Sequence, residues 1–250
     1  MIIIKFVFLI ICGYLLGNIS SAKIISKLRK DDITKHGSGN PGSMNMLRTF
    51  GFKMGILTLF FDALKGAIPS LIGFFMLGGD VNSEMCYIGL YAGGLSAVIG
   101  HCFPAFYKFK GGKGVATMLG MFAVAEPYWA IIMFAVCFLY LVIFDYGAIA
   151  SFLYITALTL IEGYKFHDNI TITIMLFFAY FLVWFMHREN INRLLLGKEN
   201  KVNFKEKLKK IGKKKNSSFA SDHLSKKEFK KAFKQNKKQS KKLEKEREIG

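Results

Sequence analysis

The sequence predicts an all-α membrane protein of about seven transmembrane helices with a basic, partly disordered cytoplasmic tail. Of its 250 residues, 52% are hydrophobic, and they gather in tracts long enough to cross the hydrocarbon core of a bilayer as helices. The positive charge is uneven, because residues 198–250 carry 20 Lys and Arg against 7 acidic residues, or 13 of the net +18. Three polar segments, all with cationic residues and the first two rich in glycine, interrupt the apolar chain, each at the end of an apolar tract.

Seven helices follow from the apolar tracts and from the residues that interrupt them. A helix usually ends before proline, so Glu126-Pro127 divides the tract Val115–Phe144, which is too long for one span. The expected helices are Ile2–Ala22, Phe52–Leu77, Met85–Phe106, Val115–Ala125, Tyr128–Phe144, Gly147–Ile161 and Ile170–Met186. We therefore expect a transmembrane domain over residues 1–198 and a lysine-rich tail over 199–250.

Lysine and arginine in the loops set the expected orientation. The loops Lys23–Lys53, Tyr107–Lys113 and His187–Arg193 are basic, as is the tail, whereas Gly78–Glu84 contains no Lys or Arg. Basic loops face the cytoplasm. Seven spans therefore place the N-terminus outside. They place the three polar segments and the C-terminus in the cytoplasm. Five spans give the same arrangement if a further segment enters the membrane without crossing it.

The tail is rich in lysine and short of apolar residues. Ser225-Lys226-Lys227-Glu228 fits a helix capping box, so Lys226–Glu246 is expected to start a helix within an otherwise disordered segment. Its positive charge suits the surface of an anionic lipid membrane.

The first glycine-rich segment is Gly37-Ser38-Gly39-Asn40-Pro41-Gly42, and Arg48 follows it. Its three glycines let the backbone fold tightly and present N–H groups to an anion. Ser38 and Asn40 add side-chain donors, and Arg48 can contact a phosphate through two parallel hydrogen bonds. An ordinary turn between helices uses the same residue types, so this segment alone does not indicate a site.

The second segment is Lys110-Gly111-Gly112-Lys113-Gly114, at the start of the expected helix Val115–Ala125. A phosphate bound there meets ammonium charge and the amide dipoles of a helix N-terminus. The pattern G-x-x-x-x-G-K-[ST] is absent, so nucleotide binding is not implied. Anchoring by positive charge explains the lysines but not the three glycines.

The third segment, His187–Arg193, follows the last expected helix directly. His187 and Asn190 are three residues apart and share a face if that helix continues. One can polarise an oxygen or accept a proton while the other holds an oxygen. Alternatively, Arg188 and Arg193 anchor the helix at the interface, and a lone histidine at a helix end is more often structural.

Within the second expected helix, Asp62 and Lys65 lie three residues apart on one face. Ionisable residues at membrane depth are candidates for function, although a self-neutralising pair facing the bundle is the favoured explanation. The chain lacks H-x-x-x-x-D and G-x-S-x-G patterns, and it lacks the carboxylate cluster of metal-dependent phosphotransferases. We therefore expect no acyl-enzyme intermediate and no metal.

Together, the three segments resemble those of the bacterial membrane acyltransferases that move a fatty acyl group from acyl phosphate to glycerol 3-phosphate. The resemblance rests on Gly37–Arg48, Gly100–Thr117 and His187–Leu194, which occur in the family's order, and it covers about Met1–Lys198. It implies a compact seven-helix protein of phospholipid synthesis with a cytoplasmic active site. It also implies no metal, no cofactor and no covalent intermediate.

The resemblance also implies the site residues. Ser38, Arg48, His187 and Asn190 fall on family positions that line the substrate site, as does Lys113 in preference to Lys110. The family usually has Ala-Thr where this chain has Ser43-Met44, so a hydroxyl contact at Met44 is lost. Further contacts to glycerol 3-phosphate and acyl phosphate are expected from Gly37, Gly39, Asn40, Asn45, Lys110, Gly111, Gly112 and Gly114.

Two other classes of protein fit parts of the sequence. A transporter of anionic solutes usually builds its site at mid-membrane from inverted repeats, and no internal repeat is evident. A membrane anchor whose polybasic tail recruits ribosomal RNA or anionic lipid accounts for the tail but not for the three segments. The expected partners are therefore the two phosphorylated substrates and membrane lipid, with no nucleic acid.

Overall fold

A computed structural model of the chain describes residues 2–78 and 81–204, in which all the regular structure is helical. The chain divides into two units, Met1–Val202 and Asn203–Gly250. The helix expected from Lys226–Glu246 and the disorder expected around it lie outside the described residues. Every element discussed below belongs to the first unit.

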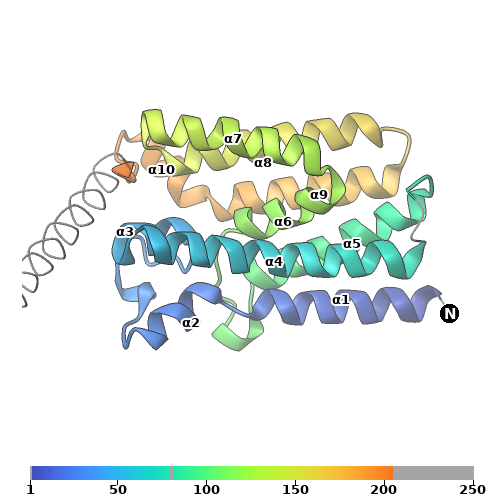
Figure 1. The fold of residues 1–250 in the computed structure, drawn as a ribbon, viewed down its shortest axis with the longest axis horizontal. Helices are drawn as coiled ribbons and strands as arrows, with labels where there is room; N and C mark the ends of the chain where they lie inside the picture. Colours follow the sequence, from blue (N-terminus) through green and yellow to red (C-terminus); the bar gives the residue numbers. More distant parts are fainter. Residues whose placement is uncertain (1, 79–80, 205–250) are drawn as a thin grey trace, which may run out of the picture. The chain divides into compact units, whose positions relative to one another are not determined.

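The described part of the first unit contains ten α-helices and two short 3-10 helices. Helices α1, α4, α5, α7, α8 and α9 run along the bundle, and the short α2, α3 and α10 gather at one end (Figure 1). Their bounds are α1 Ile2–Asn18, α2 Ser21–Leu28, η1 Ile33–Lys35, α3 Ser43–Phe50, α4 Phe52–Leu77, α5 Glu84–Cys102, η2 Ala105–Tyr107, α6 Val115–Ala125, α7 Pro127–Phe144, α8 Gly147–Lys165, α9 Ile170–Met186 and α10 Arg188–Leu195.

Several of these helices are long and apolar enough to cross a membrane. Among the described residues there are five such stretches, namely Ile2–Leu28, Phe52–Leu77, Glu84–Tyr107, Pro127–Phe144 and Gly147–Lys165. Helices α9 and α10 make a sixth if this pair, which bends by 56°, forms one broken span. Helix α6 is apolar but shorter. The helices support several spans, while the count of seven stays a prediction.

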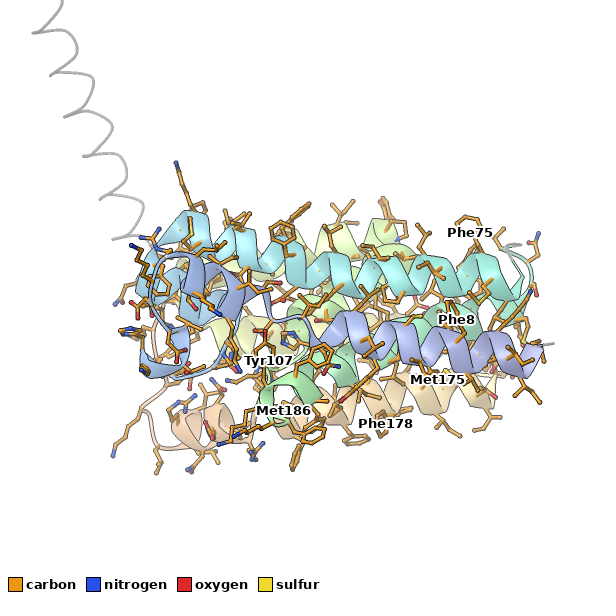
Figure 2. The ribbon with its side chains drawn as sticks, turned by 90° about the horizontal axis from the view of Figure 1, so that it is seen from below. Phe8, Phe75, Tyr107, Met175, Phe178 and Met186 are labelled. Atoms are coloured by element: carbon orange, nitrogen blue, oxygen red, sulfur yellow. The ribbon has the colours of Figure 1, made fainter. Side chains whose placement is uncertain are left out.

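The surface of the bundle changes character along its length. Nitrogen- and oxygen-bearing side chains are densest at the end that holds α2, α3 and α10 (Figure 2). Elsewhere large apolar side chains face outward, and Phe8, Phe75 and Phe178 are each more than half exposed. This is the distribution expected of a bundle whose sides face hydrocarbon and whose end faces water.

Helix α5 lies at the centre of the bundle, where it packs against α1, α4, α6 and α9. Glycines allow its close approach to α4, because a Cβ on Gly73 would overlap the carbonyl oxygen of Gly89, and a Cβ on Gly89 that of Gly73. Small residues let the backbones of membrane helices approach closely. The α4–α5 pair therefore forms a firm support for the loops that emerge from its polar end.

Most helices lie where the sequence predicts them. Helices α4, α6 and α9 have the predicted bounds. Helix α7, predicted from Tyr128, begins one residue earlier, because the fixed φ of Pro127 suits the first position of a helix. The helix predicted over Gly147–Ile161 continues to Lys165. The one predicted over Met85–Phe106 is too long, since α5 ends at Cys102. The cause is Pro104, which disfavours helical geometry at the residue before it.

The prediction of one continuous helix over Ile2–Ala22 is wrong. Helix α1 ends at Asn18, whose side-chain amide donates to the carbonyl of Tyr14 at 2.6 Å and accepts from the Phe106 N–H at 3.4 Å. Ser20 then caps α2, because its hydroxyl accepts from the N–H of Lys23. These side chains compete with the helical backbone, and the chain turns toward the polar end of the bundle.

Candidate active site

The first glycine-rich segment forms a tight loop that one buried side chain holds in place. Gly37 and Gly39 have φ angles of +56° and +70°, which favour glycine. Asn45 at the start of α3 accepts from the Ser38 N–H at 3.2 Å and donates to the carbonyl of His36 at 2.9 Å. The amide of Asn45 is therefore committed to the loop, while Ser38 stays half-exposed at its turn.

The loop ends in a second turn that leads into α3. The N–H of Gly42 donates to the carbonyl of Asn40 at 3.0 Å, and Gly42 precedes the first residue of the helix. A Cβ on Gly42 would crowd the side-chain amide of Asn40. The side chain of Met44 reaches Gly147 at the start of α8, so a thioether lies between this part of α3 and α8.

Arg48 projects from α3 toward the third segment. Its Nη2 donates to the carbonyl of Asn200 at 3.2 Å, and within the described chain its buried Nε has no hydrogen-bond partner. Burial lowers the pKa of the Arg48 guanidinium, the carboxylate of Glu199 opposes this, and the charge of Arg193 adds to the lowering. Arg48 therefore stands in a cationic group with donor capacity left for an anionic ligand.

In the second segment, Lys113 turns inward and Lys110 does not. The ammonium of Lys113 contacts the side-chain oxygen of Asn190, which joins the second and third segments directly. The side chain of Lys110 is exposed, and its carbonyl accepts from Lys23 at 3.3 Å. Gly114, with φ of +84°, then leads into α6. The structure thus separates the two lysines that the sequence left as alternatives.

Burial among like charges makes Lys113 unusually acidic. Its pKa is lowered to about 8, first by burial and then by the charge of Arg193, with a smaller contribution from Arg48. The carboxylates of Glu199 and Glu189 act in the opposite direction. An anionic ligand would relieve the repulsion and raise the pKa, so the arrangement favours a phosphate over a neutral ligand.

His187 sits at the junction of α9 and α10 and is buried. Its Nδ1 lies 2.8 Å from the carbonyl oxygen of Val183. Because a carbonyl oxygen only accepts, Nδ1 carries the hydrogen, and Nε2 of the neutral ring is left as an acceptor. His187 also lies close enough to Lys113 to interact electrostatically with it.

A residue that the sequence assigned to the tail completes the group. Glu199 is buried and accepts from Asn190 Nδ2 at 2.7 Å and from Arg193 Nε at 3.0 Å. It returns to α10 because Gly197 adopts a φ of +65° and Lys198 N–H bonds back to the carbonyl of Arg193, which together close the helix. Glycine just after a basic helical segment is the signal that could have indicated this turn.

The polar end of the bundle therefore brings residues of the second and third segments together with Arg48, which follows the first segment. Lys113, Asn190, His187 and Arg48 are linked by contact or electrostatic interaction, with Arg193 and Glu199 beside them. The loop that carries Ser38, Gly39 and Asn40 precedes α3, the helix that carries Arg48, and the Ser38 N–H donates to Asn45 of that helix. Residues 2–78 and 81–204 contain no group of three His, Cys, Asp or Glu side chains placed to hold a metal ion.

Comparison with known proteins shows which family the chain belongs to. A family model described as glycerol-3-phosphate acyltransferase matches residues 7–197. The chain belongs to this family. A curated glycerol-3-phosphate acyltransferase of Aquifex aeolicus is 39% identical over 203 residues, which cover 79% of this chain and 99% of the relative. One from Shewanella loihica is 38% identical, covering 80% and 94%.

Two solved structures of a family member share the fold. They are the glycerol 3-phosphate and lysophosphatidic acid forms of PlsY, an integral membrane glycerol 3-phosphate acyltransferase. The first matches with a TM-score of 0.71 at 38% identity, over 78% of this chain and 94% of the other. The second matches with a TM-score of 0.69 at 37% identity, over 80% and 98%. The similarity to an integral membrane protein and the apolar helices together identify the chain as a multi-pass membrane protein of the acyltransferase family.

Proposed function

We propose that this protein transfers a fatty acyl group from acyl phosphate to the 1-hydroxyl of glycerol 3-phosphate. The products are lysophosphatidic acid and inorganic phosphate, and the reaction serves membrane phospholipid synthesis. The observation that carries the proposal is the meeting of Lys113, Asn190, His187 and Arg48 at the polar end of a membrane bundle. Family membership supports the acceptor and the reaction type.

Both substrates carry phosphate, and holding two phosphates close together requires positive charge. Arg48, Lys113 and Arg193 supply three cations, which are only partly offset by the buried carboxylate of Glu199. The amides of Gly111, Lys113 and Gly114 and of the first turn of α6 add donors that keep their orientation during the reaction, while the Gly112 N–H donates to the carbonyl of His101. This set can stabilise negative charge on the carbonyl oxygen and on the departing phosphate.

In the proposed reaction, the acyl group passes directly from acyl phosphate to glycerol 3-phosphate. The 1-hydroxyl oxygen of glycerol 3-phosphate attacks the acyl carbonyl carbon, the new ester bond forms, and the bond from the acyl carbon to the phosphate oxygen breaks. The hydroxyl proton passes to His187 Nε2 or to an oxygen of a substrate phosphate. Most of the acceleration comes from positioning and charge stabilisation, for which a fixed site is suited.

Donor competition with purified protein tests this assignment. Acyl phosphate, acyl-coenzyme A and acyl carrier protein thioesters are supplied separately with glycerol 3-phosphate, and lysophosphatidic acid is measured. We expect product from acyl phosphate at least a hundredfold faster than from either thioester, on the order of 3 kcal/mol in transition-state binding. Equal or faster transfer from a thioester would overturn the proposed donor.

The orientation of the protein is proposed from its charge distribution. The N-terminus lies outside, and the site and the C-terminus face the cytoplasm, because the three segments and the tail carry the basic residues. This is supported by the gathering of charged side chains at one end of the bundle (Figure 2). The lysine-rich tail is proposed to bind anionic lipid, at about 1 kcal/mol for each lysine near the surface.

A further inference from the structure

A second buried polar cluster lies behind the site, where helices α1, α2, α4 and α5 meet, and the proposed reaction makes no direct use of it. Its members are Ser21, Asp62, Lys65 and His101, all at most 7% exposed. Charged groups at this depth are costly unless they are paired. We therefore asked which part of the fold this cluster holds in place.

Asp62 and Lys65 form the centre of the cluster and neutralise each other. The Lys65 ammonium lies 2.9 Å from Asp62 Oδ1, and the hydroxyl of Ser21 donates to the same oxygen at 2.9 Å. Lys65 also donates at 2.9 Å to the carbonyl of Ile19, which the break between α1 and α2 leaves without a helical partner. The pair thereby fixes the ends of two helices to α4.

His101 joins this pair to the second glycine-rich segment. Its Nδ1 lies 3.9 Å from Asp62 Oδ1, and its carbonyl accepts from the Gly112 N–H at 3.0 Å. The glycines rest directly on this residue, because a Cβ on Gly112 would overlap the imidazole ring and a Cβ on Gly111 the carbonyl oxygen of His101. The position of the Gly111–Gly112 backbone is therefore set by its contacts with the carbonyl and the ring of His101.

We propose that Asp62, Lys65 and His101 are positioning residues that hold the Gly111–Gly112 backbone in the shape that binds a substrate phosphate. This rests on the proposed function, since Lys113 follows Gly112 and contacts Asn190 in the site. The ion pair lies beside the His101 ring, 3.9 Å from its Nδ1, and His101 holds the loop through its carbonyl oxygen and its ring. A displacement of about 1 Å in such a loop can cost on the order of a hundredfold in rate.

The double variant D62N/K65M separates positioning from simple support of the fold. It removes both charges at nearly unchanged volume, and replacing a buried ion pair by neutral residues is often harmless to stability. We expect a folded protein in which the KM for glycerol 3-phosphate or the inhibition constant of inorganic phosphate rises at least tenfold, with a smaller change in kcat. Wild-type values of both constants in the folded variant would overturn the proposal.

A matched control is available on the same helix. Tyr91, ten residues before His101, donates to the buried Glu162 on α8. Y91F also disturbs a buried polar contact of α5, but far from the loop. Thermal unfolding in detergent should therefore report a loss of stability in Y91F without a change in either phosphate constant. Equal changes in both variants would mean that the cluster supports only the fold.

A double-mutant cycle tests the contact itself. G112A places a methyl group against the imidazole ring, and H101A removes that ring. If the ring sets the loop, G112A/H101A binds inorganic phosphate at least fivefold better than additivity of the two single variants predicts. Additive effects would contradict the proposal, and this cycle decides the question if D62N/K65M does not fold.

The same measurements test the proposed acyl transfer and the positioning role of the cluster separately. Binding of inorganic phosphate, read from its protection of wild-type protein against thermal unfolding, does not depend on the acyl donor. A wild-type protein that binds phosphate but does not transfer acyl groups would contradict the proposed function alone. Unchanged phosphate binding in D62N/K65M, in a wild-type background that transfers acyl groups, would contradict the positioning role alone.

Discussion

Arg48 and Lys113 supply positive charge to the same group of residues, yet they respond differently to their surroundings. Both are largely buried beside Arg193. A guanidinium stays charged at any pH the protein meets, whereas the lysine loses its proton close to neutrality. The two residues therefore make separable predictions.

Replacing Arg48 by alanine should remove a phosphate contact made by a fixed cation. We expect kcat/KM to fall on the order of a hundredfold, equivalent to about 2–4 kcal/mol of transition-state binding. Arg29, which stacks on Phe50 at 5.5 Å in the same basic region, provides the matched control. If R48A and R29A retain equal activity after purification, Arg48 is only a topological anchor.

The activity should depend on pH through Lys113. Below pH 8 the ammonium is charged and can bind a phosphate, and as the pH rises through its pKa of about 8 the charged fraction falls. We therefore expect kcat/KM to decrease with rising pH, approaching about tenfold per pH unit well above the pKa. K113R stays charged, so its profile between about pH 7 and 9.5 should be flatter. Identical profiles for the two proteins would refute this role.

At the scale of elements, the turn after α10 links backbone geometry to the site. Gly197 has a φ of +65°, and no atom lies within 4 Å of the position that a methyl group would take there. The turn returns Glu199 to Asn190 and Arg193. G197A should therefore cost about 1–2 kcal/mol through backbone strain alone and lower activity by displacing Glu199.

Gly163 of α8 gives the control for this substitution. It also has open space around it, but it lies within a helix. Because alanine is favoured over glycine inside helices, G163A should leave the thermal unfolding temperature unchanged or raise it. Equal thermal unfolding temperatures for G197A and G163A would show that the turn does not need glycine.

The helices were predictable from sequence where local signals decide them. Long apolar tracts and the break at Glu126-Pro127 predicted the bounds of α4, α6 and α9, and the start of α7 to within one residue. The break after Asn18 was missed, because the local signal of Asn18 and Ser20 lies inside an apolar tract and is completed by a contact with Phe106, 88 residues away. Glu199 was missed for a similar reason, since its burial follows from the fold of α10 and not from the lysine-rich sequence around it.

At the scale of the whole molecule, the site is proposed to face one side of the membrane. Single cysteines in a background without the four native ones test this with a reagent that does not cross membranes. We expect labelling from outside intact cells at S83C, and at S43C and N192C only after permeabilisation, because basic loops stay in the cytoplasm. Labelling of N192C from outside would split the site across two faces and overturn the orientation.

The central claim is that the acyl group passes directly from acyl phosphate to glycerol 3-phosphate. This claim explains why cations and a neutral His187 meet at the polar end of a membrane bundle. Phosphate release from acyl phosphate by the purified protein, with and without glycerol 3-phosphate, tests it most directly. The account predicts release only when glycerol 3-phosphate is present, with one lysophosphatidic acid formed for each phosphate. A burst of phosphate without glycerol 3-phosphate would indicate an acyl-enzyme and contradict it.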